Sequence, residues 1–398
     1  MRIAYFVAEY QSFAGSQKSL LYTIRAWKQQ GGEAVVLLPG EGKCAQVFRQ
    51  HGIPTMILHA PPSLHLFQRR LLILPSWKKA VIWMKEVLPY SWKINHFLTK
   101  AGCQLLHCNS TRSILIAGWI PHWRRVPLVL HIRGKQVEKG MLWRLAQQLA
   151  NRIVVVANHL KAEINPYHQS KVRLLYNAII PEEVEHLSIM PEDGLTLPQD
   201  ERPLVVSLAS LIPRKGIHHL IHAAAIVNHE QPTLFAIAGG EADQAYSAYV
   251  RELAKKLCPR SFFFTGWLAN PYPLLRRAQI AALATISVPE AVPTDNPNTM
   301  PVGEGMPRFV LEAMSLGKPV VATFVDGCDE AITDRETGFL VPPANPEAMA
   351  KAIKSLLKNP KLAKQMGERG RQRVEEHFSM ERHQRVLAEI YSELLRGG

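Results

Sequence analysis

The 398-residue chain has few cysteines, no long apolar run and, in its first half, few acidic residues. Its five cysteines are odd in number and scattered, which favours a reducing compartment over a disulfide framework. No run of about 18 apolar residues occurs, so no segment is predicted to span a membrane. Charge interrupts the opening MRIAYFVAEY, and no apolar core of a signal peptide follows it. We therefore expect a cytoplasmic protein.

The shortage of acidic residues makes the charge very uneven along the chain. Residues 1–190 carry 24 lysines and arginines against 9 aspartates and glutamates, a net charge of +15. Residues 191–398 carry 23 against 24, a net charge of −1. Such asymmetry indicates an anionic partner for the first half: nucleic acid, an acidic membrane surface or a phosphorylated substrate.

Apolar strands alternate with helical segments in both halves, which predicts an α/β fold with two doubly wound parallel sheets. The alternation stops at residues 181–202, an acidic segment with three prolines that we interpret as a linker. We predict one domain over 1–185 and a second over 186–379, with a final helix at about 380–398 packing back on the first. Ligands of such folds bind at the carboxyl ends of the strands, here in a cleft between the domains.

One segment of the second half, EGMPRFVLEAMSLGKP from Glu304, carries the clearest chemical signal. Pro307 suits the first turn of a helix and Gly317 its end, which predicts a helix over 308–316. The amino terminus of that helix offers N–H groups and a positive dipole to a phosphate. Glu304 before it and Glu312 inside it could hold hydroxyl groups on either side of a pyrophosphate. Alternatively, Glu304 only complements the helix dipole and Glu312 is solvated.

Further residues extend this motif across the chain. They are Gly305, Ala313 and Met314, the run 317–322, Gly327, Glu330, Gly338, Val341 and Pro342, the segment SLASLIPRKG that ends at Gly216, the turn AIAGGE, and Asn177. Together with Glu304 and Glu312, this set resembles glycosyltransferase family 4, the retaining transferases with the GT-B fold of two Rossmann-like domains. The resemblance covers nearly the whole chain.

The resemblance implies a role for each matching residue. Glu304 would face the hydroxyl groups of the donor sugar, and Glu312 the ribose. Lys215 would neutralise the diphosphate, whose charge grows in the transition state. His131 would extend into the cleft beside the reacting sugar, so the implied catalytic residues are His131, Glu304 and Lys215. The other implied donor-binding residues are Gly15, Arg214, Gly239, Gly240, Gly305, Met306, Arg308, Phe309 and Glu330.

Several of these residues have plainer interpretations. Lys215 could be a solvated charge, and His131 a hydrogen-bonded histidine of the core. We interpret His218, His219 and His222 as a solvated helix face rather than as metal ligands. The family resemblance implies no metal and no cofactor, and it implies a UDP- or GDP-sugar as substrate.

The chain also departs from the family pattern. Ser210 stands where the family usually has arginine, for which Arg214 or Arg133 could substitute. Ala14 replaces one glycine of the turn after the first strand, and Pro307 removes one N–H from the anion site. Residues 288–303 form a long loop rich in proline and asparagine, either a lid or donor-selectivity loop or a surface insertion.

Residues 62–100 mix cations with tryptophans and aliphatic clusters, which is typical of a peripheral membrane face. They could also simply form the core of this region. We expect docking on the inner face of the cell membrane and a lipid-linked or cell-surface saccharide acceptor. The main hypothesis is therefore a metal-independent, retaining hexosyltransferase. The alternatives are a lapsed transferase that scaffolds a membrane complex and, disfavoured because no recognition motif occurs, a nucleic-acid-binding protein.

Overall fold

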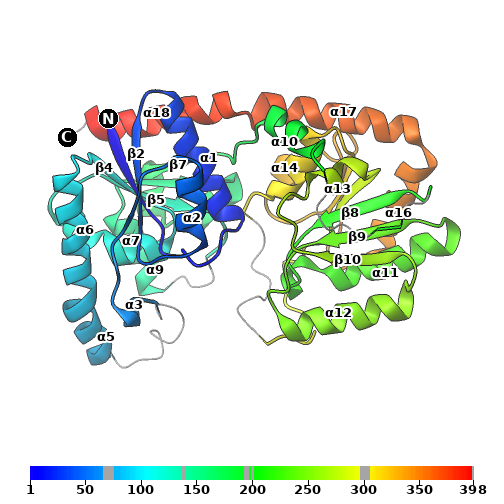
Figure 1. The fold of residues 1–398 in the computed structure, drawn as a ribbon, viewed down its shortest axis with the longest axis horizontal. Coiled ribbons are helices and arrows are strands. Elements are labelled where there is room, and N and C mark those ends of the chain that lie inside the picture. The colour runs from blue at the N-terminus through cyan, green and yellow to red at the C-terminus, as the bar shows by residue number, and fades with distance from the viewer. Residues whose placement is uncertain (66–75, 137–139, 192–196, 199–200, 296–304, 397–398) are drawn as a thin grey trace. The chain divides into compact units, whose positions relative to one another are not determined.

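The computed structural model describes residues 1–65, 76–136, 140–191, 197–198, 201–295 and 305–396. The chain divides into two compact units (Figure 1). Unit 1 comprises Met1–Ala178 and Met380–Gly398, and unit 2 comprises Ile179–Ser379. The sequence had suggested a boundary at 185, seven residues after the one observed.

Unit 1 is built on a seven-stranded parallel sheet in the order β3-β2-β1-β4-β5-β6-β7. Its strands are β1 (Arg2–Phe6), β2 (Glu33–Leu38), β3 (Thr55–Ile57), β4 (Leu105–Cys108), β5 (Leu128–Ile132), β6 (Arg152–Val155) and β7 (Val172–Leu174). Its helical segments are α1 (Gly15–Gln29), α2 (Lys43–Gln50), α3 (Pro62–His65), α5 (Ser76–Ile82), the π-helix η1 (Trp83–Val87), α6 (Leu88–Lys100), α7 (Thr111–Ala117), α8 (Trp119–Trp123), α9 (Met141–Leu149), the 3₁₀ turns η2 (Asn158–Glu163) and η3 (Pro166–Lys171), and α18 (Met380–Arg396). The strand order reverses between β1 and β4, which is where such sheets bind ligands at their carboxyl edge.

Unit 2 is built on a six-stranded parallel sheet in the order β10-β9-β8-β11-β12-β13. Its strands are β8 (Leu204–Leu208), β9 (Leu234–Ala238), β10 (Phe262–Gly266), β11 (Ile280–Leu283), β12 (Val320–Thr323) and β13 (Phe339–Val341). Its helices are α10 (Pro181–Ser188), the 3₁₀ turn η4 (Pro213–Lys215), α11 (Ile217–Glu230), α12 (Gln244–Leu257), α13 (Tyr272–Arg277), α14 (Arg308–Ser315), α15 (Cys328–Ala331), α16 (Pro346–Lys358) and α17 (Pro360–His377). The order reverses between β8 and β11, so the loops after these two strands lie side by side. The predicted pair of parallel α/β sheets is confirmed.

The predicted linker at 181–202 is partly wrong, because its first residues form α10 and belong to unit 2. Pro181 occupies the first helical turn, where its missing N–H costs nothing, and Glu182 and Glu183 complement the helix dipole there. Val184 is buried. The acidic, proline-containing sequence therefore marked a helix start as well as a change of unit.

Two features of the structure relate to the expected reducing compartment and to the expected lack of a membrane-spanning segment. All five cysteines lie in the described residues, and each is a buried free thiol. No helix among the described residues has both the length and the apolar character needed to cross a bilayer.

Candidate functional site: the carboxyl edges of the two sheets

The helix predicted to start the anion site exists as α14, which begins at Arg308 and ends at Ser315. Pro307 caps it in an extended conformation, and Gly305 and Met306 before it are buried. Gly327 presses on this loop so closely that a Cβ there would lie 2.0 Å from the Gly305 carbonyl oxygen. The start of α14 therefore rests on a fixed turn. Glu304 lies outside the described residues.

Glu312 is buried, which excludes the interpretation that it is a solvated helix residue. The Tyr272 hydroxyl donates a hydrogen bond to Glu312 Oε1 at 3.0 Å, and Arg308 Nη2 lies 3.4 Å from the same oxygen. Arg308 is itself buried, as is its neighbour Phe309. The carboxylate is thus held in place from α13 and from its own helix, and Tyr272 is a partner that sequence reasoning missed.

Lys215 and Arg214 lie in η4, the turn that follows β8. Gly216 ends the turn with φ +57, and a Cβ at Gly216 would meet the Ala284 carbonyl oxygen at 2.0 Å. The Ile286 amide also donates to the Arg214 carbonyl at 3.0 Å. Only glycine permits this approach, so the backbone that carries the two cations is fixed against the loop after β11, at the point where the strand order reverses.

Gly239 and Gly240 follow β9 at the same edge of the sheet. A Cβ at Gly239 would lie 2.0 Å from the Ala209 carbonyl oxygen, so this glycine is needed by the protein's own backbone. Gly240 accepts a hydrogen bond from the Leu211 amide at 2.9 Å. Glu330 is half-buried on α15, just after β12. Strand ends of unit 2 thus gather the predicted donor-binding residues, apart from Glu304 and from Gly15 of unit 1.

In unit 1, Gly15 begins α1 and has open space beside it, since no atom lies within 4 Å of the position of a Cβ. The Ala14 amide donates to Gln17 Oε1 at 3.2 Å, and Gln17 is buried. The packing of unit 1 therefore leaves room beside the first turn of α1.

The side chain of His131 is fully buried, as the alternative interpretation of a hydrogen-bonded core histidine predicts. Its Nδ1 lies 3.0 Å from His107 Nε2, and His107 Nδ1 lies 2.8 Å from the Tyr391 hydroxyl on α18. Tyr391 in turn donates to the Tyr5 hydroxyl at 3.2 Å. Burial and the nearby Arg133 charge lower the pKa of His131. This chain of four side chains, which we call the imidazole–hydroxyl chain, joins β1, β4, β5 and α18.

Arg133 takes the place at the end of β5 that the sequence had assigned to His131. Its Nε donates to Asn109 Oδ1 at 3.0 Å, and its Nη1 donates to Asn177 Oδ1 at 3.2 Å. Asn109 follows β4, and Asn177 is the asparagine singled out by the family resemblance. Residues two apart share a face of a strand, so Arg133 continues the face of His131, but it lies beyond the last residue of β5 and is only half-buried. The LHIRG segment contains both candidates, and sequence reasoning chose the buried one.

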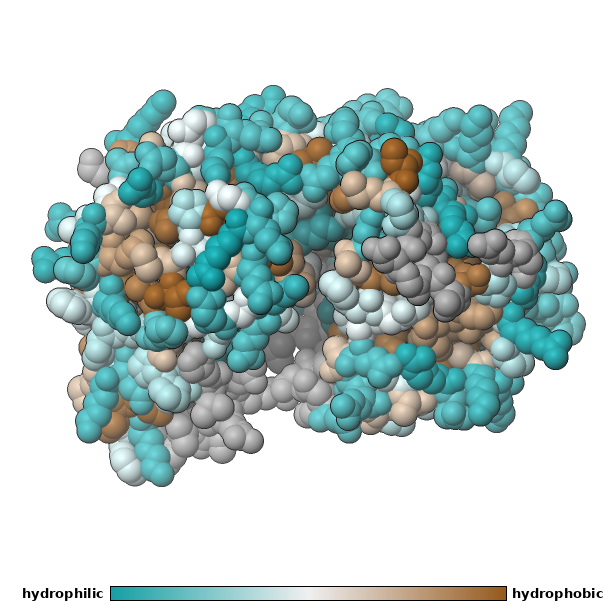
Figure 2. Space-filling model, viewed as in Figure 1, coloured by the Kyte–Doolittle hydropathy of each residue, from teal (hydrophilic) through white to brown (hydrophobic). Residues whose placement is uncertain are grey.

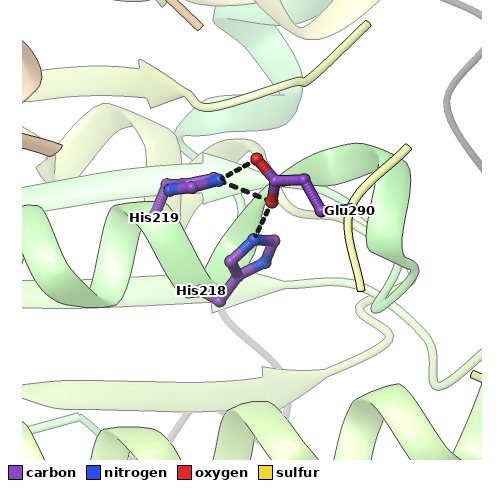
Figure 3. A group of neighbouring side chains, drawn as sticks. All are labelled: His218, His219 and Glu290. Carbon is purple, nitrogen blue, oxygen red and sulfur yellow. Dashed lines mark hydrogen bonds and ion pairs between the residues drawn. The ribbon is translucent and has the colours of Figure 1, made fainter. Parts of the chain in front are cut away.

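The interpretation of His218 and His219 as a solvated face is also wrong. His218 is buried and His219 half-buried, and both approach Glu290, a residue of the loop after β11 (Figure 3). The Nε2 atoms of His218 and His219 lie 2.7 and 2.8 Å from Glu290 Oε2. His222, by contrast, is exposed as predicted. The partner was missed because it comes from a loop 71 residues further on.

Comparison with known proteins agrees with this architecture. Residues 13–183 match the family model described as Glycosyltransferase Family 4, and residues 195–373 match the model described as Glycosyl transferases group 1. The structure is similar to that of the Anabaena protein HepE in complex with UDP-glucose, with a TM-score of 0.76 at 19% identity over 99% of this chain and 100% of that one. It is also similar to sucrose-phosphate synthase from Thermosynechococcus elongatus, with a TM-score of 0.71 at 19% identity over the whole of both chains. These likenesses define the GT-B fold.

Among curated proteins, the chain is 31% identical over 195 residues to the GDP-mannose-dependent alpha-(1-6)-phosphatidylinositol monomannoside mannosyltransferase of Mycolicibacterium smegmatis. That alignment covers 48% of each chain. It is 41% identical over 95 residues to a trehalose synthase of Pyrococcus horikoshii, covering 24% of this chain and 22% of that one. The chain thus matches about half the length, or less, of these relatives. With both halves matched by family models, it belongs to the family 4 glycosyltransferases.

Proposed function

We propose that this protein transfers a hexosyl group from a nucleotide-diphosphate sugar to an acceptor, with retention of configuration at the anomeric carbon. The observation that carries the proposal is the carboxyl edge of the unit 2 sheet. This edge carries the start of α14, the buried Glu312 and the cations of η4. They follow β8 and β11, the two strands between which the strand order reverses. A UDP- or GDP-sugar fits this chemistry because diphosphate, ribose and sugar each need one of these groups.

In the proposed mechanism, unit 2 holds the donor. Lys215 and Arg214 neutralise the diphosphate, and the first-turn N–H groups of α14 add the positive end of the helix dipole. Glu312 accepts hydrogen bonds from the ribose, and Glu304 from hydroxyl groups of the donor sugar. Because negative charge on the leaving diphosphate grows as the glycosidic bond breaks, fixed cations stabilise the transition state more than the ground state.

The remaining donor-site residues shape the pocket or add polar groups to it. Gly239, Gly240, Gly305, Met306 and Phe309 supply backbone and apolar walls, Arg308 orients Glu312, and Glu330 lies near the nucleoside. The departing diphosphate oxygen assists attack by the acceptor on the same face of the sugar. The proposed transfer therefore uses no protein nucleophile, no metal and no cofactor. Arg133 replaces His131 as the polar group of unit 1 at a strand end.

Donor screening tests this proposal. Purified protein is incubated with UDP-, GDP- and ADP-sugars, and release of the nucleoside diphosphate is measured, with calorimetry for binding. We expect binding and slow hydrolysis with one nucleotide class. The absence of binding to every member of the panel would instead favour a lapsed transferase that acts as a scaffold.

The acceptor is proposed to be a lipid-linked or cell-surface saccharide, reached from the inner face of the cell membrane. Large apolar side chains are exposed on the packed segments α5, η1, α6 and α8 of unit 1: Trp77 at 65%, Met84 at 57%, Trp92 at 60% and Trp123 at 57%. Figure 2 shows apolar atoms at the lower left, where Figure 1 draws α5. Lys78 lies beside the Trp77 ring, 5.3 Å from its centroid. Aromatics mixed with cations suit an anionic lipid surface.

Vesicle sedimentation tests the membrane proposal. We expect the protein to bind vesicles that contain phosphatidylserine more strongly than neutral ones, and the double variant Trp77→Ala/Trp92→Ala to lose most of this binding. Tyr167→Ala is the matched control, because Tyr167 is an exposed aromatic of the same unit outside these segments. Equal binding by the double variant and the control would contradict the proposed docking face, and retention on DNA at matched salt would favour nucleic acid.

A further inference from the structure

Three side chains converge from two elements of unit 2. His218 and His219 lie in the first turn of α11, and Glu290 comes from the loop after β11. The two imidazole Nε2 atoms and a carboxylate oxygen all lie within 4.8 Å of one another. Figure 3 shows both rings directed at the same carboxylate. These three donor atoms thus face one another, next to β8 and β11, between which the strand order reverses.

The ring nitrogen of His218 that faces away from Glu290 is also held in place. His218 Nδ1 lies 2.8 Å from the hydroxyl of Tyr246, which is fully buried on α12. A hydrogen bond on the other ring nitrogen orients a metal-binding histidine and sets its tautomer.

We propose that His218, His219 and Glu290 bind one Zn²⁺ ion, with water in the fourth position. Two imidazoles and a carboxylate form a donor set that zinc accepts, and imidazole disfavours Mg²⁺ or Ca²⁺. Ligand atoms around tetrahedral zinc lie roughly 3.3 Å apart, since each is about 2.0–2.2 Å from the ion. The present separations of 2.7 and 2.8 Å between the Nε2 atoms and Glu290 Oε2 need only a small opening of the cluster. Side-chain exposures of 6%, 16% and 28% leave an entry path on the Glu290 side.

The position of the ion gives it a structural role, independent of the sugar transfer proposed above. Glu290 belongs to the loop after β11, and the same loop is tied to Asp243, the N-cap of α12, by the Thr294 hydroxyl and by the Asp295 amide at 3.2 Å. Zinc would replace the hydrogen bonds that already join Glu290 to α11 with metal coordination. Because the unfolded chain cannot assemble the three ligands, the binding free energy adds to the stability of unit 2.

The test uses the full chain, freed of metal by a chelator and titrated with Zn²⁺ against a chromophoric competitor. We expect one ion per chain, a rise in the midpoint of thermal unfolding, and the visible absorption of tetrahedral cobalt when Co²⁺ replaces Zn²⁺. Glu290→Gln and His219→Ala should each weaken Zn²⁺ binding at least about tenfold, because each removes one of three ligands. His222→Ala is the matched control, an exposed histidine on the same helix.

Wild-type protein that takes up no ion at this titration would overturn the proposal and leave a purely hydrogen-bonded tie. Equal Zn²⁺ affinity in wild type, Glu290→Gln and His219→Ala would overturn it too, because the ion would then lie elsewhere. Should a variant unfold, the wild-type stoichiometry and the cobalt spectrum still decide. Calorimetry with nucleotide sugars is run on the same samples, so loss of zinc and loss of donor binding are scored separately.

Discussion

The two units use polar residues in opposite ways. The sheet of unit 2 is packed in an apolar core that includes Val205, Phe235 and Ala282, and its candidate site residues come after the strands end. The sheet of unit 1 instead buries the imidazole–hydroxyl chain within β1, β4 and β5. In unit 2, a polar residue next to an apolar strand therefore indicates a candidate donor-binding residue. In unit 1, such a residue can equally belong to the core, as His131 does.

Among the variants that test this difference between the units, Lys215→Ala should have the largest effect on activity. It removes a fixed cation from the strand-end turn of unit 2, and we expect kcat/KM for the donor to fall by about 10²-fold. The measurement is steady-state release of nucleoside diphosphate. Lys255→Ala, which changes an exposed lysine of α12, should leave the rate unchanged. Equal rates for the two variants would remove Lys215 from the site.

Glu312→Gln should lower kcat/KM by roughly tenfold to 10²-fold, because the amide keeps the shape of the side chain and can still accept from Tyr272 but lacks the charge. Circular dichroism and thermal unfolding check that the fold is retained. A variant that is fully folded and fully active would show that Glu312 serves only the packing of α14.

Arg133→Ala and His131→Asn separate the two candidates of unit 1. We expect Arg133→Ala to lower kcat/KM for the donor by about tenfold in a protein that remains folded, because it removes a charge at a strand end. His131→Asn should instead cost about 1–3 kcal/mol of unfolding free energy, because it breaks a buried hydrogen-bonded chain. The reverse outcome, a stable but inactive His131→Asn and an active Arg133→Ala, would restore His131 to the site.

Tyr391→Phe tests whether the imidazole–hydroxyl chain holds α18 on unit 1. The change deletes the hydroxyl that contacts His107 and Tyr5, and it should cost about 1–3 kcal/mol. Denaturant unfolding followed by fluorescence measures it. Tyr167→Phe, at a tyrosine that is 91% exposed, should change nothing. A loss no larger than that of this control would mean that apolar packing alone fixes the helix.

Glu393→Gln should have the smallest effect, below about 1 kcal/mol, because the pair that Glu393 forms with Arg173 is partly solvated. The Arg173 hydrogen bond lowers the pKa of Glu393 in the folded protein. The stabilisation is therefore present above the unfolded pKa and is lost as pH falls through the folded one. Unfolding curves between neutral and acid pH measure it, with Glu389→Gln on the same helix as control. If Glu393→Gln were still less stable than wild type at low pH, the ion pair with Arg173 would not be the source of the stabilisation.

Much of the fold was predictable because it depends on local pattern. Alternating apolar strands and helices predicted both sheets, and Pro307 with Gly317 predicted α14 to within one residue of its end. What failed depends on contacts distant in sequence. The partner of His218 is 72 residues away, and the group that contacts His107 is 284 residues away on α18. The hydrophobic periodicity of the sequence cannot predict either of these partners.

The proposed donor chemistry assigns the nucleotide sugar to the strand ends of unit 2. Calorimetric titration of wild type and Lys215→Ala with UDP- and GDP-sugars measures this directly. We expect one molecule of donor per chain for wild type and binding weakened by at least about tenfold for the variant. Saturable donor binding that is the same in both proteins would contradict it, because the diphosphate would then be held without the η4 cation.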